Sequence, residues 1–341
     1  MKKAFVVTAA LALLCLGGIA QAVTIATVPV GNPGNAGELS GEGAGGYGPD
    51  RICGSVGYDY NIGKYEVTAG QYTDFLNKVA RTDTYALYST GMSNTSYGSG
   101  ITRIGDSGSY AYSVAPAFIN RPVNYVSWGD SARFANWLHN GQPTGAQGLA
   151  TTEDGAYYLN GATTDAQLLA VNREADWRWA ITSEDEWYKA AYHKNDGVTG
   201  NYFDYPTSNN TAPGQDMADV SGNNANYYTA PYAFPIDAGK YTTVAGEFQN
   251  SDSPYGTFDQ GGNVWEWNEA LLYGADRGLR GGSFGDDIGY LQASGRVGCL
   301  YPTTESDGFG FRVSEVVPEP SSIIALAGGL ISLLGIRRRR V

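Results

Sequence analysis

The sequence predicts a single loop-rich α+β domain with little regular secondary structure, and two observations favour this class. First, the 341 residues include 47 glycines and 25 tyrosines, while only 16% of the chain is charged. This composition is typical of an exported protein with many loops and differs from that of a helical cytosolic enzyme. Second, three short helical patterns and one strand pattern are separated by long polar segments near residues 82–120, 141–170 and 195–255. Loops of that length inside a domain are usually binding surfaces or insertions.

The first 22 residues predict a secretion signal that is removed. Lys2 and Lys3 precede an apolar run that ends at Ala20, and Ala20 and Ala22 place small residues two apart, as a signal peptidase requires. An N-terminal membrane anchor is the alternative, which a pair of glycines late in the run disfavours. We therefore expect cleavage after Ala22.

The C-terminal segment, residues 317–341, predicts export sorting. It begins with Val317-Pro318-Glu319-Pro320, continues with an apolar run of about 16 residues and ends with four arginines. A helix needs about 20 apolar residues to cross a bilayer, and clustered arginines stay on the cytoplasmic side. The segment resembles the PEP-CTERM sorting signal. This resemblance implies that an exosortase-type membrane protease cuts near the motif and releases or re-attaches the protein outside the cell. A plain tail anchor is the alternative.

The expected mature chain is strongly acidic. The whole sequence has a net charge of −12, and its two ends hold six of the 22 basic residues and one of the 34 acidic ones, which leaves about −17. Such a surface repels nucleic acid and anionic lipid and is compatible with calcium. Cys53 and Cys299 remain after signal removal. In an oxidising compartment they either form a disulfide or stay buried, and the sequence leaves both open.

Between the two ends, the first elements are a lead-in and a hairpin. Residues 23–54 are rich in glycine and proline and predict an irregular lead-in. Alternating apolar residues between Tyr58 and Val67 predict a hairpin around Asn61-Ile62-Gly63-Lys64.

Two helices are predicted from their N-terminal capping residues. Thr68 and Gln71 form a capping box, and Ser127 is followed three residues later by Asp130. Gly141 ends the second helix. Apolar residues at helical spacing form the buried faces, namely Tyr72, Phe75, Leu76, Val79, Phe134 and Leu138.

A third helix opens at Thr182-Ser183-Glu184-Asp185-Glu186 and runs through Trp187, Ala190 and Ala191. The three acidic residues of its first turn suit the positive end of the helix dipole. Catalysis by this acid cluster is the alternative, and capping is the simpler explanation.

Five segments, in chain order, carry a resemblance to a known family. They are Lys64-Tyr65-Glu66-Val67-Thr68, followed by Tyr72 and Phe75; Pro122-Val123-Asn124-Tyr125-Val126-Ser127-Trp128; Thr182-Ser183-Glu184-Asp185-Glu186-Trp187; Asp259-Gln260-Gly261-Gly262-Asn263-Val264-Trp265-Glu266-Trp267; and Arg280-Gly281-Gly282-Ser283-Phe284, closing at Gly310-Phe311-Arg312-Val313. Over residues 55–315 the chain resembles the formylglycine-generating-enzyme family, also called the sulfatase-modifying-factor domain. The resemblance implies a C-type-lectin-like α+β fold.

The same resemblance implies calcium at the fourth segment. Matched to the family's calcium loop, Asp259 and Glu266 supply carboxylate oxygens, while Gly262 and Val264 supply carbonyl oxygens. Calcium takes six to eight oxygen ligands, and a tightly bent chain can offer several carbonyls at once. A glycine turn with Glu266 paired to an arginine is the alternative. A second, weaker calcium site is expected at Asn226, Tyr227 and Asp237.

Copper chemistry is not expected. The family's active members hold copper(I) between two cysteines, five apart, just after the G-G-S motif, and oxidise a substrate cysteine to formylglycine. Ser283 and Tyr290 match that pocket and Trp265 borders it, but the two cysteine positions read Asp286 and Leu291. Copper(I) is soft and needs thiolate ligands. We therefore expect neither copper nor formylglycine-generating activity.

Iron is not expected either. A related branch of the family holds non-haem iron with three histidines, two of them in an H-x-E pattern. This chain has only His139 and His193, and neither is followed by x-Glu. Both are expected at helix ends, where the dipole favours them.

These observations favour an exported binding module, at the cell surface or in the extracellular matrix, that takes a glycan or peptide ligand. Tyrosine-rich polar loops suit such ligands. An enzyme with retained or altered activity in the same pocket, using Ser283, Asp286 and Arg296, is one alternative, and a purely structural matrix component is another. Residues expected in the core are Trp128, Trp187, Trp265 and Trp267, with Arg296 and Arg312 as buried ion-pair partners.

Overall fold

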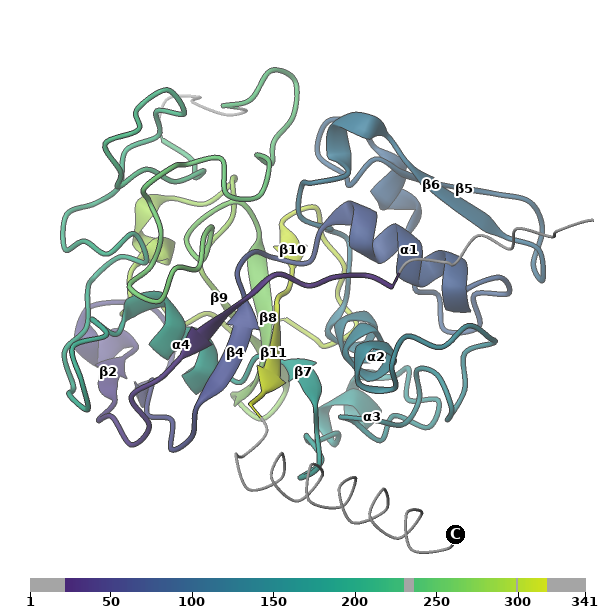
Figure 1. The fold of residues 1–341 in the computed structure, drawn as a ribbon, viewed down its shortest axis with the longest axis horizontal. Helices are drawn as coiled ribbons and strands as arrows, with labels where there is room; N and C mark the ends of the chain where they lie inside the picture. The colour runs from purple at the N-terminus through teal and green to yellow at the C-terminus, as the bar shows by residue number, and fades with distance from the viewer. Residues whose placement is uncertain (1–21, 230–235, 299, 318–341) are drawn as a thin grey trace, which may run out of the picture.

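The computed structural model describes residues 22–229, 236–298 and 300–317 (Figure 1). The secretion signal, the sorting tail and Cys299 lie outside the described residues. The strands are β1 (Thr27–Val30), β2 (Glu38–Ser40), β3 (Arg51–Cys53), β4 (Tyr60–Gly63), β5 (Ile101–Ile104), β6 (Ala111–Val114), β7 (Trp179–Ile181), β8 (Trp265–Leu272), β9 (Asp276–Arg280), β10 (Phe309–Gly310) and β11 (Val313–Val316). The helices are α1 (Ala69–Val79), α2 (Trp128–His139), α3 (Asp165–Leu169) and α4 (Glu184–Tyr192).

Two small sheets organise the centre of the molecule. The larger sheet has the order β1-β4-β11-β7, so it joins the start, the middle and the end of the described chain. The second has the order β10-β8-β9, in which β8 and β10 are parallel. Helices and long loops surround these strands (Figure 1). Short strands, few helices and extensive loops confirm the predicted loop-rich α+β class.

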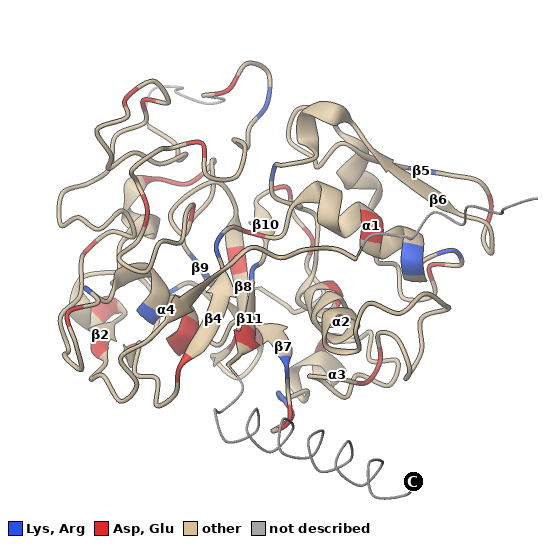
Figure 2. Cartoon of the chain, in the orientation of Figure 1, with Lys and Arg blue, Asp and Glu red and all other residues tan. Residues whose placement is uncertain are grey.

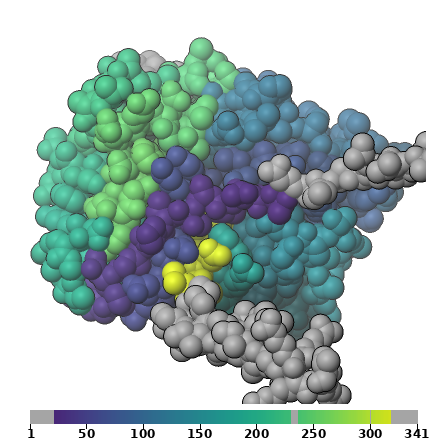
Figure 3. Space-filling model, in the orientation of Figure 1, coloured from purple at the N-terminus to yellow at the C-terminus, as the bar shows by residue number. Residues whose placement is uncertain are grey.

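The lead-in is not irregular throughout, which corrects the sequence-based prediction. It contains β1, β2 and β3, and β1 pairs with β4 from Thr27↔Gly63 to Val30↔Tyr60. In Figure 3 this segment runs as a continuous band across one face of the molecule. The partner of β1 lies further along the chain, whereas β2 pairs with β3 inside the glycine-rich segment itself.

The predicted hairpin between Tyr58 and Val67 is wrong. Only β4 forms there, and its neighbours are β1 and β11, both distant in sequence. The residues after Gly63 bend toward α1 instead of pairing back on β4. Alternation indicated a strand but gave no information about its partner.

The three helix starts are confirmed. Thr68, Ser127 and Ser183 each cap a helix, and each forms a complete capping box with the residue three positions later. Gly141 follows the end of α2 with a φ of 79°. The apolar faces of α1 and α2 are buried, and the Phe75 and Phe134 rings meet edge to face at 5.3 Å.

The tryptophan-rich core is also confirmed. Trp128, Trp187 and Trp267 are completely buried, and Trp265 is 6% exposed. Acidic residues are spread over the loops around the molecule, whereas several arginines lie among the central strands (Figure 2). Within residues 22–229, 236–298 and 300–317, no helix is long and apolar enough to cross a membrane.

Candidate functional site

The predicted pocket is built on a glycine turn that follows β9. Gly281 and Gly282 have φ angles of 98° and 74°, which favour glycine. A side chain at Gly281 would also meet the carbonyl oxygen of Gln260 at 2.6 Å. The turn places Ser283 beside Asp286 and brings both under Trp265, so the structure brings these predicted pocket residues together.

Asp286 holds this turn in shape. Its Oδ2 accepts hydrogen bonds from the backbone N–H of Ser283 at 3.0 Å, from the Ser283 hydroxyl, and from Trp265 Nε1 at 2.7 Å. Ser283 is only 4% exposed. The carboxylate is therefore a structural acceptor that holds the turn.

Leu291 lies against the glycine turn but offers no ligand atom: a side chain at Gly282 would meet its Cδ1 at 3.0 Å. It is completely buried and packs in a cluster with Tyr205, Ala225 and Tyr227. The second of the two matched cysteine positions is thus filled by hydrocarbon inside a small apolar core. Neither matched position offers sulfur to a soft metal.

A stack of three aromatic rings borders the turn. Tyr290 stacks on Tyr47 with ring centres 4.6 Å apart and meets Trp265 edge to face at 5.4 Å. Tyr47 is 44% exposed. Sequence reasoning missed Tyr47, because it lies in the lead-in. The available signal was its position as a lone aromatic residue in a run of glycines from residue 41 to residue 48.

The glycines of this run let the Tyr47 loop lie flat on residues 294–296. A side chain at Gly46 would meet the Ser294 carbonyl oxygen at 2.1 Å, and one at Gly48 would meet that of Arg296 at 1.8 Å. The N–H of Arg296 donates to the Tyr47 carbonyl at 3.0 Å. The backbone therefore fixes the position of the Tyr47 ring.

A polar hollow of about 320 Å³ opens beside the same loop. Glu38, Asp204, Asn210 and Gln292 contribute polar side chains to its lining, and Tyr205 adds a ring. Burial raises the pKa of Glu38, although a hydrogen bond from the Tyr188 hydroxyl opposes this rise. Carboxylates, amides and rings are groups that hydrogen-bond and stack on polyhydroxylated or peptidic ligands.

The carboxylate of Glu266 is engaged by other side chains, and its predicted role as a calcium ligand stays a prediction. Arg312 donates to both of its carboxylate oxygens at 2.5 Å, and Trp187 Nε1 donates to Oε2 at 2.7 Å. Both partners of this ion pair are completely buried. The ion pair is the alternative interpretation that the sequence had left open, and it also confirms Arg312 as a buried ion-pair residue.

The rest of the loop bends as the prediction requires. Asp259, Gly262 and Asn263 all have positive φ angles, of 58°, 81° and 63°. Asp259 Oδ2 accepts from the N–H of Gly246 at 2.6 Å. Burial raises the pKa of Asp259 to about 6, although the Gly246 N–H and the Arg312 guanidinium oppose this rise.

Negative charge exceeds positive charge around this loop. Glu66 is 1% exposed, and its Oε2 has no hydrogen-bond partner among the described residues. Burial, reinforced by the charge of Asp259, raises the pKa of Glu66 well above its ordinary value. Glu66, Asp259 and Glu266 thus share the single guanidinium of Arg312. Protons or a bound cation can offset the excess.

The weaker predicted calcium site stays a prediction, and in this structure two of its three residues use their oxygens in other contacts. The carboxylate of Asp237 pairs with Arg121, and the carbonyl of Tyr227 accepts from the Gln215 side chain. Asn226 Oδ1 is buried without a partner among the described residues. Across the part of the chain that the structure describes, no three His, Cys, Asp or Glu side chains are grouped closely enough to hold a metal ion.

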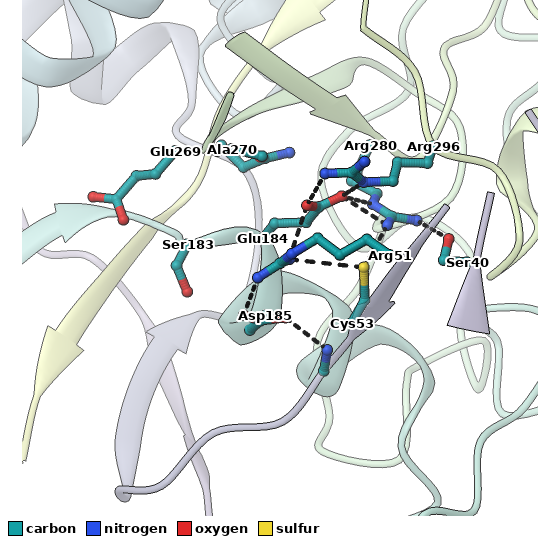
Figure 4. Close-up of polar contacts among 12 residues, drawn as sticks. Ser40, Arg51, Cys53, Ser183, Glu184, Asp185, Glu269, Ala270, Arg280 and Arg296 are labelled. Atoms are coloured by element: carbon teal, nitrogen blue, oxygen red, sulfur yellow. Dashed lines mark hydrogen bonds and ion pairs between the residues drawn. The ribbon is translucent and has the colours of Figure 1, made fainter. Parts of the chain in front are cut away.

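Glu184 is the centre of a buried ionic cluster (Figure 4). Arg280, Arg296 and Arg51 approach its carboxylate to 2.8, 2.7 and 2.9 Å, and Asp185 pairs with Arg51 at 2.6 Å. Burial by itself would raise the pKa of Glu184. The three arginines, Arg280 most strongly, outweigh burial and lower this pKa to about 2. Capping of α4 is confirmed, but these acids also join β3, α4, β9 and the loop after Leu291.

Cys53 lies beside this cluster. Its Sγ accepts from Arg280 Nη2 at 3.2 Å, and the thiol is completely buried (Figure 4). Burial raises its pKa despite the nearby guanidinium groups. It is a free cysteine among the described residues. The predicted alternatives for Cys53 and Cys299 cannot be compared further, since Cys299 lies outside those residues.

Both histidines lie at helix ends as predicted. His139 is the last residue of α2, and His193 is the C-cap of α4. His193 is buried, and burial lowers its pKa. The dipole of α4 therefore does not keep His193 protonated.

Comparisons with known proteins agree with this geometry. Residues 51–316 match the family described as sulfatase-modifying factor enzyme 1-like domain, and residues 316–340 match the PEP-CTERM protein-sorting motif. No curated protein matches the chain by sequence.

Two solved structures share the fold at low sequence identity. Variable protein 1 of Treponema denticola is 17% identical, with 86% of this chain and 95% of that chain covered and a TM-score of 0.50. CarF is 19% identical, with 86% and 99% covered and a TM-score of 0.52. The predicted C-type-lectin-like α+β fold is confirmed.

Proposed function

Because this chain belongs to the sulfatase-modifying factor enzyme 1-like family and carries a PEP-CTERM sorting motif, we propose that it is an exported surface or matrix protein whose domain binds a glycan or peptide. The observation that carries the proposal is the exposed Tyr47 ring, stacked on Tyr290 beside a polar hollow. The motif implies recognition by an exosortase-type sorting system and attachment through the C-terminus before processing.

The donor set of the pocket supports binding rather than cysteine oxidation. At the two positions matched to copper-binding cysteines, Asp286 is engaged by Ser283 and Trp265, and Leu291 is buried among apolar side chains. A carboxylate is a hard ligand and leucine has no ligand atom. An altered activity that uses Arg296 is also disfavoured, since Arg296 forms a bidentate pair with Glu184.

The aromatic stack and the hollow suit a ligand that has both a flat face and polar groups. Tyrosine rings offer a large contact area at a low cost in conformational entropy. The Tyr47 carbonyl accepts a backbone hydrogen bond from Arg296 and its ring stacks on Tyr290, so little order has to be gained on binding. The hollow supplies carboxylate and amide groups that accept or donate hydrogen bonds within the same region.

Calcium remains part of the proposal in a narrower form. Asp259 and the carbonyl groups of Gly262 and Val264 are the candidate ligands, without Glu266. The unpartnered buried oxygen of Glu66 beside Asp259 supports a cation near this loop, because a cation would give that oxygen a partner. A bound cation would neutralise charge and hold the bend of residues 259–263.

A glycan and peptide array tests the binding function. The processed protein, purified from cells that export it, is expected to bind a restricted set of array members. Tyr47→Ala should weaken that binding by about 3- to 10-fold, because an aromatic contact contributes about 0.5–1.5 kcal/mol. Tyr273→Ala is the matched control, since Tyr273 is 61% exposed on the β8–β9 connection. Absence of binding, or equal losses in both variants, would contradict the proposal.

A further inference from the structure

The sorting tail leaves the domain at a defined place. The N–H of Val316, the last residue of β11, donates to the Arg178 carbonyl at 3.0 Å, and Glu315 pairs in register with Trp179. The sorting motif begins at residue 316, and Val317 is 36% exposed. The tail therefore starts at the end of β11, next to the edge strand β7, without an intervening linker.

Little chain separates this edge from the apolar run. Six residues lead from Val317 to Ile323, the first large apolar residue of the run. Even a fully extended chain of that length spans at most about 20 Å. While the tail holds the protein in a membrane, the β7 edge must therefore lie within about 20 Å of the hydrocarbon region.

The side chains at this edge are those that favour a membrane interface. Trp177 and Trp179 are half-buried and flank Arg178, whose side chain is 64% exposed. Tyr58, 42% exposed, meets Trp177 edge to face at 6.4 Å. Tryptophan and tyrosine concentrate at the level of lipid headgroups, and arginine extends its charged end to water or phosphate.

We propose that this membrane-facing edge (Tyr58, Trp177, Arg178 and Trp179) lies in the headgroup region of the bilayer as long as the sorting tail is uncut. The inference rests on the proposed attachment through the tail. The expected mature charge of about −17 disfavours attraction to anionic lipid, so the contact depends on the aromatic rings. Asp59 and Asp176, both exposed beside the edge, stay in water.

This orientation places the candidate binding site away from the membrane. Trp265 at the start of β8 pairs with Phe309 of β10, and eight residues lead from Phe309 to Val317. An extended chain of that length spans up to about 28 Å. In Figure 1, β10 lies at one end of the central strands and β11 ends at the other, so the edge contact would present the pocket to the exterior.

A lipid-quenching experiment tests the inference on the full chain reconstituted in neutral phosphatidylcholine vesicles. A fluorophore such as NBD is attached to Arg178→Cys and, as the matched control, to Ile104→Cys, which is 70% exposed on β5. Spin-labelled phosphatidylcholine should quench the label at position 178 several-fold more than the label at position 104, with little change on added salt. The unsubstituted chain is treated with the fluorophore in the same way, and its fluorescence shows how much label attaches to the native cysteines.

Flotation of the vesicles separates failure of the inference from failure of attachment. If the chain floats with the vesicles but both labels are equally open to aqueous iodide, the edge does not contact the bilayer and the inference is wrong, while attachment through the tail stands. If the chain does not float, attachment through the tail fails, and the inference fails with it. Neither outcome affects the array result for Tyr47.

Discussion

Replacement of Glu184 by glutamine is expected to lower the free energy of unfolding by about 3–5 kcal/mol. Three arginines converge on this carboxylate, and two of them, Arg280 and Arg296, are at most 6% exposed. Glu184→Gln leaves these guanidinium groups in the interior without their counter-charge. Chemical denaturation at neutral pH measures the loss. Glu315→Gln is the control, since its pair with Arg178 is exposed and 3.9 Å long, and it should cost less than about 1 kcal/mol.

The pH dependence gives a second readout of the same variant. The pKa of Glu184 is about 2 in the folded protein, below its ordinary value of 4.5, so the unfolded chain binds the proton more readily. The contribution of Glu184 is complete above about pH 4.5 and is lost as the pH falls toward 2. Glu184→Gln should therefore lose part of the acid sensitivity of the protein. An unchanged stability at neutral pH would show that the arginines relax into water.

Glu266→Gln is expected to destabilise the protein by a similar amount, about 3–5 kcal/mol, in calcium and in EDTA alike. The reason is that Glu266 is the buried partner of Arg312, with both side chains completely inaccessible to solvent. Thermal unfolding in the two buffers measures the effect.

Asp259→Asn tests calcium binding separately from the ion pair between Glu266 and Arg312. Calcium should raise the melting temperature of the unsubstituted chain and of Glu266→Gln, whereas Asp259→Asn should lose most of that rise. Saturating calcium at about 100 times its Kd contributes about 2.7 kcal/mol. The rise should be larger above pH 6 than below it, because the pKa of Asp259 is about 6 and a protonated carboxyl binds calcium poorly. A calcium effect that disappears in Glu266→Gln would restore Glu266 as a ligand.

Helices were predictable from the sequence because their signals are local. Thr68, Ser127 and Ser183 form capping boxes with residues only three positions away, so each helix start could be read from a short segment. The order of the glycine- and tryptophan-containing segments, matched to a family, indicated the fold that local signals alone could not supply.

Strand partners were not predictable because they depend on distant residues. β4 pairs with β1 and with β11, which lies some 250 residues further along the chain. The same limit applies to β1 of the lead-in, which pairs with β4. Without long-range information, the alternation around Asn61 was interpreted as a hairpin.

The candidate site was partly predictable. Ser283, Asp286, Trp265 and Tyr290 meet as the resemblance implied. Tyr47 was missed because it lies before the matched family region and joins the stack only through the folded lead-in. The arginine partners of Glu184 were missed for a similar reason, since ion pairs across the core leave no local pattern.

The central claim is that this family scaffold binds without oxidising cysteine, and it is tested most directly by the mass of a cysteine-containing peptide after incubation. The processed protein is supplied with copper(I) and oxygen, and the peptide is analysed by mass spectrometry. An unchanged cysteine is the predicted result, because Asp286 and Leu291 occupy the two matched ligand positions. Conversion of the peptide cysteine to formylglycine would contradict the account.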